Sequence, residues 1–377
     1  MSIKTIEKLM ITSLLMISSA MTQAVTYTVT STQCEGAGSI TEAMQSANST
    51  PGEDTIEIAA GLEIDWGQCP PEPGEFDRSL YYTLQATESV ILEGNGAKLT
   101  GGIWWVDTDG INRAGQRCPI STDIILSETP GFIKVGVEGA DNSAITVTVR
   151  DLALDTLSAV ALIEEQASLV LENLTLRNIW SAPISLCQQP AVIARAGANF
   201  AAHNTDWISV SQDNEPLGGV FYRGAIDGVE GAGDLTIEDS TLQAFQKSGV
   251  ISWNGQAGSE VNIVTSRFNE AGGISVSGEA TTNIVNSIWS NSLFGPPQED
   301  ERFINLSSGP MNFIASTVMF SSVQCDDECQ SPGGPFPGPS AGLGPFIASI
   351  DQTNVVGKIN FIQTAVGVDR PDEKGID

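Results

Sequence analysis

The side chains best suited to acid–base chemistry lie around His203, the one histidine of the chain. Histidine is the side chain whose ordinary pKa falls nearest neutrality. Arg195, Asp206, Asp213 and Arg223 lie in the same stretch of sequence. A lyase acting on a polyuronate needs a cation or an arginine to neutralise the substrate carboxylate, and a basic side chain to remove the neighbouring proton. The segment from Arg195 to Arg223 is therefore the candidate region for that chemistry.

The position of His203 within the chain favours a structural role instead. Arg150, Glu172 and Glu238 stand at the equivalent position of similar segments, which indicates a solvated turn site. A glycosidase would need two carboxylates that face each other across about 5–9.5 Å. Because the chain holds 46 Asp and Glu residues, such a pair is expected on almost any surface and identifies nothing. The sequence therefore assigns no catalytic residue.

The sequence also assigns no metal-binding or cofactor-binding residue. Asp326-Asp-Glu328 could bind Ca²⁺, but no spaced Asp-x-Asp-x-Asp-Gly loop is present, so we interpret the run as solvated charge. Ca²⁺ stays an alternative without a supporting motif. Cys325 and Cys329 could hold Zn²⁺ or close a small disulfide loop, and the single histidine argues against zinc. Gly94-Asn-Gly96 is interpreted as a turn, because no phosphate-loop pattern follows it.

Tryptophan side chains could stack on sugar rings. Trp66, Trp104 and Trp105 lie in long non-repetitive insertions, where an exposed aromatic pair beside a groove would suit that role. The other candidates, Trp207, Trp253 and Trp289, share alternating positions with aliphatic residues, and we expect them to lie in a core.

Most of the chain is a repeat, and the repeat must position any site. Seven segments share two apolar residues at alternating positions, a spacer, a turn residue, and another apolar residue three places on. They are 147–154, 169–176, 200–207, 235–242, 261–268, 282–289 and 311–318, with turn residues Asp151, Asn173, Asn204, Asp239, Thr265, Asn286 and Ala315. A second strand-like piece follows in most repeats, at Ile184/Leu186, Val220/Tyr222, Ile251/Trp253, Ile274/Val276 and Ile304/Leu306.

This pattern predicts an all-β, right-handed parallel β-helix. Alternation places one set of side chains inside and the other outside, and stacked coils about 4.8 Å apart pair their backbones in parallel ladders. Small polar turn residues tolerate left-handed backbone, and stacked asparagines can hydrogen-bond along a column. A sandwich would show more hairpin dipeptides than Asn95-Gly96 and Asn254-Gly255. A propeller blade would need about 40 or more residues per repeat. The expected inward residues are Val147, Leu169, Phe200, Leu235 and Val261; the expected outward ones are Thr148, Thr236, Asn262, Asn283 and Asn312.

A short amphipathic helix is expected to cover the first coil. Ser39-Ile-Thr-Glu42 is a capping box, and Ile40, Ala43, Met44 and Ala47 follow one helical face. Pro51-Gly52 ends the helix before the strand-like 54–58.

The segment from Gly38 to Met44, followed by Ala47-Asn48 and by 51–56, resembles the N-terminal segment of exported bacterial β-helix proteins, known for a Cys-Ser-Leu-Arg-Glu-Ala core. The segment 90–101 also resembles the first coil of pectin-lyase-like β-helices, and 369–377 resembles the segment that closes such chains. Gly38 stands where the family has Cys, and Thr41 where it has Arg. The resemblance implies this fold and export, and such proteins include adhesins and surface proteins.

The start of the chain and its charge define the expected location and exclude some partners. Lys4 and Lys8 precede the apolar run 9–15 and the small residues up to Ala24, which predicts a signal peptide cleaved after Ala24. The net charge of −29 disfavours nucleic acid and anionic membranes as partners. Six cysteines suggest up to three disulfides, among them a possible link between Cys69 and Cys118.

The expected organisation is a signal peptide at 1–24, one β-helix domain at 25–345 that includes the cap and the insertions, and a C-terminal tail or last partial coil at 346–377. We expect a secreted or cell-surface protein without catalytic activity, adhesin-like or binding a polysaccharide or cell-surface glycan. The alternative is a polysaccharide lyase or glycoside hydrolase that acts on an acidic polysaccharide.

Overall fold

The computed structural model describes the chain in several segments. They are 24–65, 83–100, 105–106, 112–113, 132–155, 157, 160–179, 190–209, 225–243, 250–269, 273–292, 304–306, 309–321, 349–350 and 358–369. Among these residues no helix combines the length and apolar character that a membrane span requires.

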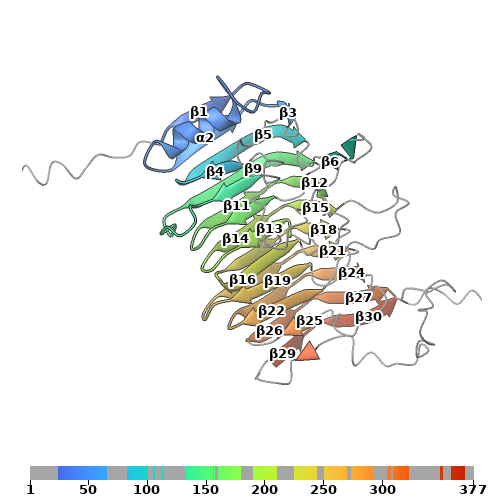
Figure 1. Cartoon of the computed structure of the whole chain (residues 1–377). Helices are drawn as coiled ribbons and strands as arrows, with labels where there is room; N and C mark the ends of the chain where they lie inside the picture. The colour runs from blue at the N-terminus through green and yellow to red at the C-terminus, as the bar shows by residue number, and fades with distance from the viewer. Residues whose placement is uncertain are drawn as a thin grey trace, which may run out of the picture.

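Two stacks of parallel strands run the length of the molecule (Figure 1). The long sheet contains β1 (Thr26–Val29), β2 (Asp54–Ile58), β3 (Glu63–Asp65), β5 (Val90–Thr100), β9 (Thr146–Asp155), β11 (Ser168–Glu172), β12 (Thr175–Ile179), β14 (Asn199–His203), β15 (Asp206–Ser209), β17 (Leu235–Glu238), β18 (Thr241–Gln243), β20 (Glu260–Val264), β21 (Arg267–Asn269), β23 (Thr281–Val285), β24 (Ile288–Ser292), β26 (Pro310–Ile314), β27 (Thr317–Ser321), β29 (Lys358–Ile362) and β30 (Ala365–Asp369).

The second sheet closes each coil on the other side of the core. It contains β4 (Leu84–Ala86), β8 (Ile133–Val135), β10 (Ala161–Ile163), β13 (Val192–Ala194), β16 (Ile226–Ala232), β19 (Ile251–Gly255), β22 (Ile274–Gly278), β25 (Ile304–Leu306) and β28 (Ser349–Ile350). Outside the two stacks, the short strands β6 (Trp105–Val106) and β7 (Asn112–Arg113) pair antiparallel. The chain is thus a right-handed parallel β-helix, as the repeat predicted.

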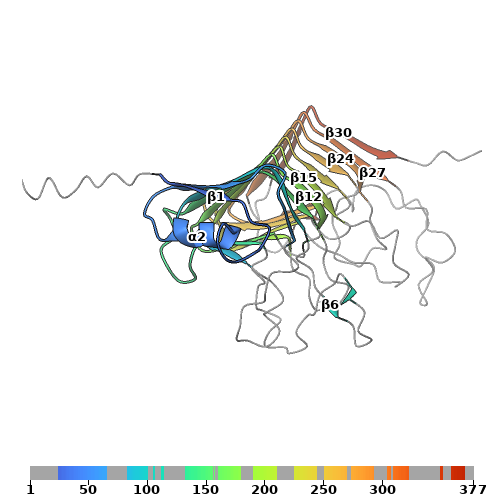
Figure 2. The same ribbon diagram turned by 90° about the horizontal axis from the view of Figure 1, so that it is seen from above.

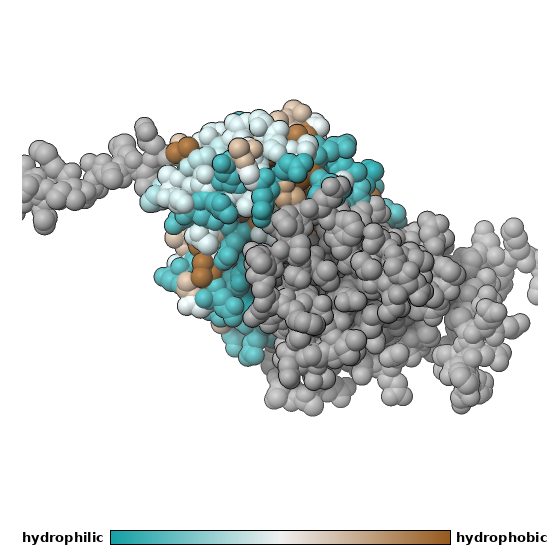
Figure 3. All heavy atoms as spheres, turned by 45° about the horizontal axis from the view of Figure 1, so that its top comes forward, coloured by the Kyte–Doolittle hydropathy of each residue, from teal (hydrophilic) through white to brown (hydrophobic). Residues whose placement is uncertain are grey.

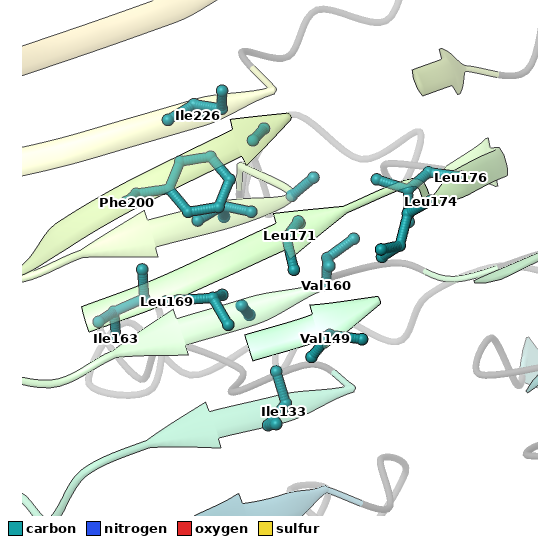
Figure 4. Close-up of a cluster of buried hydrophobic side chains, with 14 of the residues drawn as sticks. Ile133, Val149, Val160, Ile163, Leu169, Leu171, Leu174, Leu176, Phe200 and Ile226 are labelled. Carbon is teal, nitrogen blue, oxygen red and sulfur yellow. The ribbon is translucent and has the colours of Figure 1, made fainter. Parts of the chain in front are cut away.

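Like residues stack on like residues along the core. Leu169 in β11 pairs with Val147 on one side and with Phe200 on the other. Buried and partly exposed residues alternate along β11 and β14, so these three side chains point inward. Figure 4 shows Leu169 and Phe200 from successive strands on the same side of their sheet. The predicted inward set is therefore confirmed.

In each coil the long sheet bends sharply, so that one strand segment precedes the bend and another follows it. Figure 2 shows this corner end-on. At the corner the seven predicted turn residues have φ between 49° and 54°, in the left-handed region. Asn204 also donates its side-chain amide N–H to Asn173 Oδ1, 2.7 Å away. Both the left-handed backbone and the stacking of asparagines were predicted from the repeat. The corner residues are Asp151, Asn173, Asn204, Asp239, Thr265, Asn286 and Ala315.

A buried ladder of hydroxyls follows the corner in the C-terminal coils. The backbone N–H of Ser240 donates to Ser266 Oγ at 3.2 Å, and that of Ser266 donates to Ser287 Oγ at 3.1 Å. Each serine hydroxyl also lies within hydrogen-bonding distance of the carbonyl two residues earlier, as Ser266 Oγ does with Val264 O at 2.9 Å. In the earlier coils Leu152 and Leu174 take this position and are buried. The inside of the corner is therefore apolar at one end of the molecule and hydrogen-bonded at the other.

The helix α2 (Ile40–Asn48) covers the N-terminal end of the coils (Figure 1). The hydroxyl of Ser39 accepts the N–H of Glu42, and the Glu42 carboxylate accepts the N–H of Gly38. The Ser39 half of the predicted capping box is confirmed, whereas the Glu42 carboxylate bonds one residue earlier than predicted, because the N–H of Ser39 donates to Gly36 O. The apolar face buries Ile40, Ala43, Met44 and Ala47 in the same core cluster as the inward residues of β1 and β2.

Three of the five predicted second strands are described, and strands are also present in the segment expected to be a tail or last partial coil. The second strands predicted around 251, 274 and 304 are β19, β22 and β25, whereas those at 184–186 and 220–222 lie outside the described residues. In the corresponding coils the described second-sheet strands are β13 and β16. Beyond residue 345, β28, β29 and β30 pair with β25, β26 and β27, so the ladders continue to Asp369.

Candidate functional site

A column of asparagine side chains lies on the outer face of the long sheet. Asn262, Asn283, Asn312 and Asn360 pair in register across β20, β23, β26 and β29. Asn283, Asn312 and Asn360 each donate an amide N–H to the amide oxygen of the preceding coil, at 3.0 Å, 2.9 Å and 2.7 Å in turn. Asn262, the first of the four, donates instead to Glu260 Oε2 at 3.0 Å. We call these four residues the amide column. Three of them were predicted to point outward, and Asn360 extends the column by one coil.

The amide column keeps hydrogen-bonding capacity for a ligand. A side-chain amide has two N–H donors and an oxygen that accepts two hydrogen bonds. Asn283 and Asn312 each use one donor and one acceptor along the column. Both side chains are partly exposed, so one donor and one acceptor per coil remain available to solvent.

A column of branched aliphatic residues runs beside the amides. Val264, Val285, Ile314 and Ile362 follow two positions later on the same strands and therefore share the outer face. Ile362 has 49% of its surface exposed, and the other three are partly exposed. The C-terminal coils thus present a polar column and an apolar column side by side, with the exposed carboxylate of Glu260 next to the first amide.

The same outward position carries charge in the N-terminal coils. Glu93, Arg150, Glu172, His203 and Glu238 pair in register along this column. Arg150 makes an ion pair with Glu93, whose carboxylate raises the pKa of the guanidinium above its ordinary value. Figure 3, which brings the N-terminal end forward, shows mainly hydrophilic residues on the described surface in view. The outer face therefore changes character along the molecule.

His203 belongs to this charged column. Its Nδ1 lies 3.2 Å from Glu238 Oε2, and the two side chains are 36% and 46% exposed. Asp206 lies at the start of β15, on the other side of the corner. Arg195 instead follows β13 of the second sheet. The structure therefore places Arg195 after β13, His203 at the end of β14 and Asp206 at the start of β15, while Asp213 and Arg223 lie outside the described residues.

A buried charge cluster at the second sheet was not anticipated from the sequence. Glu164 is fully buried, and its carboxylate lies 2.7 Å from Lys134 Nζ and 3.0 Å from Arg195 Nη1. These contacts are ion pairs rather than well-aligned hydrogen bonds. Glu138, largely exposed, lies 3.8 Å from the same guanidinium. Because Glu164 has no exposed surface, the cluster neutralises an internal charge and offers no open catalytic carboxylate.

The remaining sequence candidates divide into core residues and undescribed ones. Trp207, Trp253 and Trp289 are at most 1% exposed, which confirms their predicted core positions. Trp105 lies in β6, while Trp66, Trp104, 326–328 and Cys69, Cys118, Cys325 and Cys329 lie outside the described residues. Within the described segments no group of three His, Cys, Asp or Glu side chains could hold a metal ion.

Comparisons with models of known protein families and with curated proteins found no match to this chain.

Proposed function

We propose that this is an exported, non-catalytic protein that binds an extended polysaccharide or cell-surface glycan along the amide column. The observation that carries the proposal is the regular stack of Asn262, Asn283, Asn312 and Asn360, each hydrogen-bonded to the next and still able to bond to a ligand.

The chemistry of the two columns suits a sugar chain. Successive coils are about 4.8 Å apart, which is close to the rise per sugar in an extended polysaccharide. Sugar hydroxyls can both donate to and accept from side-chain amides. The C–H faces of the rings can pack on Val285 and Ile314, two positions along the strand from the amides. A sugar ring is itself polar at its edge and apolar on its faces, so it matches both columns at once.

Charge favours a neutral polysaccharide over a polyuronate. The chain has a net charge of −29, and a polyanion would be repelled by it. The amide column and its aliphatic neighbours add no positive charge. In the described segments, the basic residues Lys98, Lys134, Arg150 and Arg195 each contact a carboxylate. Those pairs reduce the positive charge available to a substrate carboxylate, which argues against the lyase alternative.

Three features support export. The run from Lys4 to Ala24 has the form of a cleavable signal peptide. The segment from Gly38 to Met44, in which the hydroxyl of Ser39 caps the helix, resembles that of exported bacterial β-helix proteins. Cys34 is disulfide-bonded, as is typical of oxidising compartments.

Binding measured against a panel of neutral polysaccharides and polyuronates tests the proposal. We expect binding to a neutral polysaccharide, weakened about tenfold in the Asn283→Ala/Asn312→Ala double variant, because two hydrogen bonds of about 1 kcal/mol each are partly lost. Thr148→Ala/Thr236→Ala is the matched control, since both residues lie in the same outward column of other coils.

Two outcomes would contradict this function. Equal binding by the two double variants would exclude the amide column as the binding surface. Release of unsaturated sugars or new reducing ends from any polysaccharide in the panel would establish the enzymatic alternative. The lyase and hydrolase readings are distinguished by the product, since only a lyase forms an unsaturated sugar.

A further inference from the structure

Asp54, the first residue of β2, is a buried carboxylate with no cationic partner among the described residues. The side chain is 0% exposed. Its Oδ1 accepts the backbone N–H of Val25 at 2.7 Å. Its Oδ2 is buried and has no hydrogen-bond partner among the described residues. One neutral donor is therefore all that the structure supplies to this side chain.

The other fully buried carboxylate of the described segments does have cationic partners. Glu164 has two cationic neighbours, Lys134 and Arg195, within 3.0 Å. A buried carboxylate is expected to pair with an opposite charge, because removing it from water is costly and one neutral hydrogen bond compensates little of that cost. Within the described part of the chain, Asp54 thus lacks the kind of partner that the same fold provides for Glu164.

The nitrogen that faces Asp54 belongs to the residue at which the mature chain is expected to begin. Val25 directly follows Ala24, after which the sequence predicts cleavage. The carbonyl of Val25 accepts the N–H of Thr55 at 2.8 Å, and β1 pairs in register with β2 immediately afterwards. Val25 is therefore held by the ladder, with its nitrogen directed at the carboxylate, while Ala24 is exposed.

We propose that hydrolysis of the Ala24–Val25 peptide bond creates the ion-pair partner of Asp54. Water adds across the bond under the action of a signal-type peptidase. Ala24 leaves as a carboxylate, and the Val25 nitrogen becomes an ammonium group by taking up the proton that balances the charge. The ammonium has three N–H donors where the peptide had one, so it can bond to Oδ2 as well as Oδ1.

This ion pair would stabilise the N-terminal end of the solenoid. β1 pairs with β2, and α2 contacts both strands and β4. An ion pair between Val25 and Asp54 would fix the start of β1 to the start of β2 and so hold the cap in place. The mature protein would have a firmly closed first coil, and the precursor a weaker one. This inference rests on export and not on glycan binding, so either can fail without the other.

A comparison of two N-termini tests the proposal without changing any side chain. One protein is released from a cleavable fusion so that it begins at Val25, and the other begins at Met21. We expect the shorter protein to melt several degrees higher. We also expect the Thr55 amide hydrogen to exchange at least about tenfold more slowly in the shorter protein. A tenfold change in exchange corresponds to the free energy of one pKa unit, which is the stabilisation expected from the ion pair. Equal melting and equal exchange would overturn the proposal.

The Asp54→Asn variant identifies the carboxylate as the partner. In that background the two N-termini should behave alike, because the amide side chain offers no charge to pair. Glu53→Gln is the matched control, since it removes the adjacent exposed carboxylate and should leave the difference intact. A difference that survives in Asp54→Asn would overturn the proposal, and so would an exported protein whose sequenced N-terminus is not Val25.

Discussion

At the scale of single residues, the corner of the long sheet accounts for much of the sequence pattern. A left-handed backbone costs an ordinary L-residue about 1–2 kcal/mol, and asparagine and aspartate tolerate it best. Five of the seven predicted corner residues are Asn or Asp, which is why the corner could be recognised. Thr265 and Ala315 adopt the same conformation with φ of 51° and lack that tolerance.

Thr265→Asn should therefore stabilise the protein. The exposed side chain would be less strained, and its amide could bond to Asn286 in the next coil, as Asn204 bonds to Asn173. We expect a gain of about 1 kcal/mol in the free energy of unfolding. Denaturant titration measures it.

Thr148→Asn is the control for this substitution. Thr148 is an outward residue within β9, away from the corner, and its partners Ile91 and Val170 have no side-chain amide to bond to. It should show no comparable gain. A gain of the same size in both variants would mean that asparagine helps for a reason unrelated to the left-handed backbone.

At the scale of elements, the serine ladder joins neighbouring coils where the strands turn. Ser266→Ala removes the acceptor of the Ser240 N–H, which is buried. An unsatisfied buried donor costs about 1–3 kcal/mol, and we expect a loss of that size by thermal or chemical unfolding. Ser275→Ala is the control, because Ser275 lies on the partly exposed face of β22. Equal losses would show that the ladder adds nothing to coil stacking.

The elements of the long sheet could be predicted because the corner sets their register. With each turn residue identified, the residues before and after it alternate inward and outward. The strands β10 and β13 have no such marker, since all three residues of each are buried and no alternation appears. They could not be assigned from the sequence. The strand β29 fits the repeat, with Gln363 at the corner, although a long interruption separates it from the coil before.

The candidate site was predictable in part for the same reason. Asn262, Asn283 and Asn312 share one position in the repeat, so their stacking follows from the register. The partners of Asp54 and Glu164 do not share a position. They come together across coils whose loops differ in length, and no spacing in the sequence indicates Val25 or Lys134 as their neighbours.

At the scale of the whole molecule, each coil bonds only to the coils beside it, so damage to one coil should stay local. Ile284 is fully buried in β23, between β20 and β26. Ile284→Asp would bury an unpaired charge and should unfold the C-terminal coils while the N-terminal ones persist. Hydrogen exchange measured segment by segment should show protection lost around β23 and retained in β9 and β11.

Asn283→Asp provides the matched comparison for that variant. Asn283 is adjacent in sequence and faces outward, so the new charge stays in contact with water. We expect a loss of about 1 kcal/mol, from the one hydrogen bond that the carboxylate can no longer donate. If the two variants melted alike, the assignment of inside and outside in this coil would be wrong.

The burial of tryptophan in three different coils has an optical consequence. Trp207, Trp253 and Trp289 are each enclosed by the core, and the ring of Trp289 is stacked on Phe268 with centroids 4.0 Å apart and planes 2° apart. An indole in such surroundings emits at shorter wavelength than one in water. Because the three coils need not open together, the fluorescence spectrum of the unmodified protein should shift to the red in steps. Replacing one of the three tryptophans with phenylalanine should remove its step, which assigns each step to a coil and shows which end of the solenoid unfolds first.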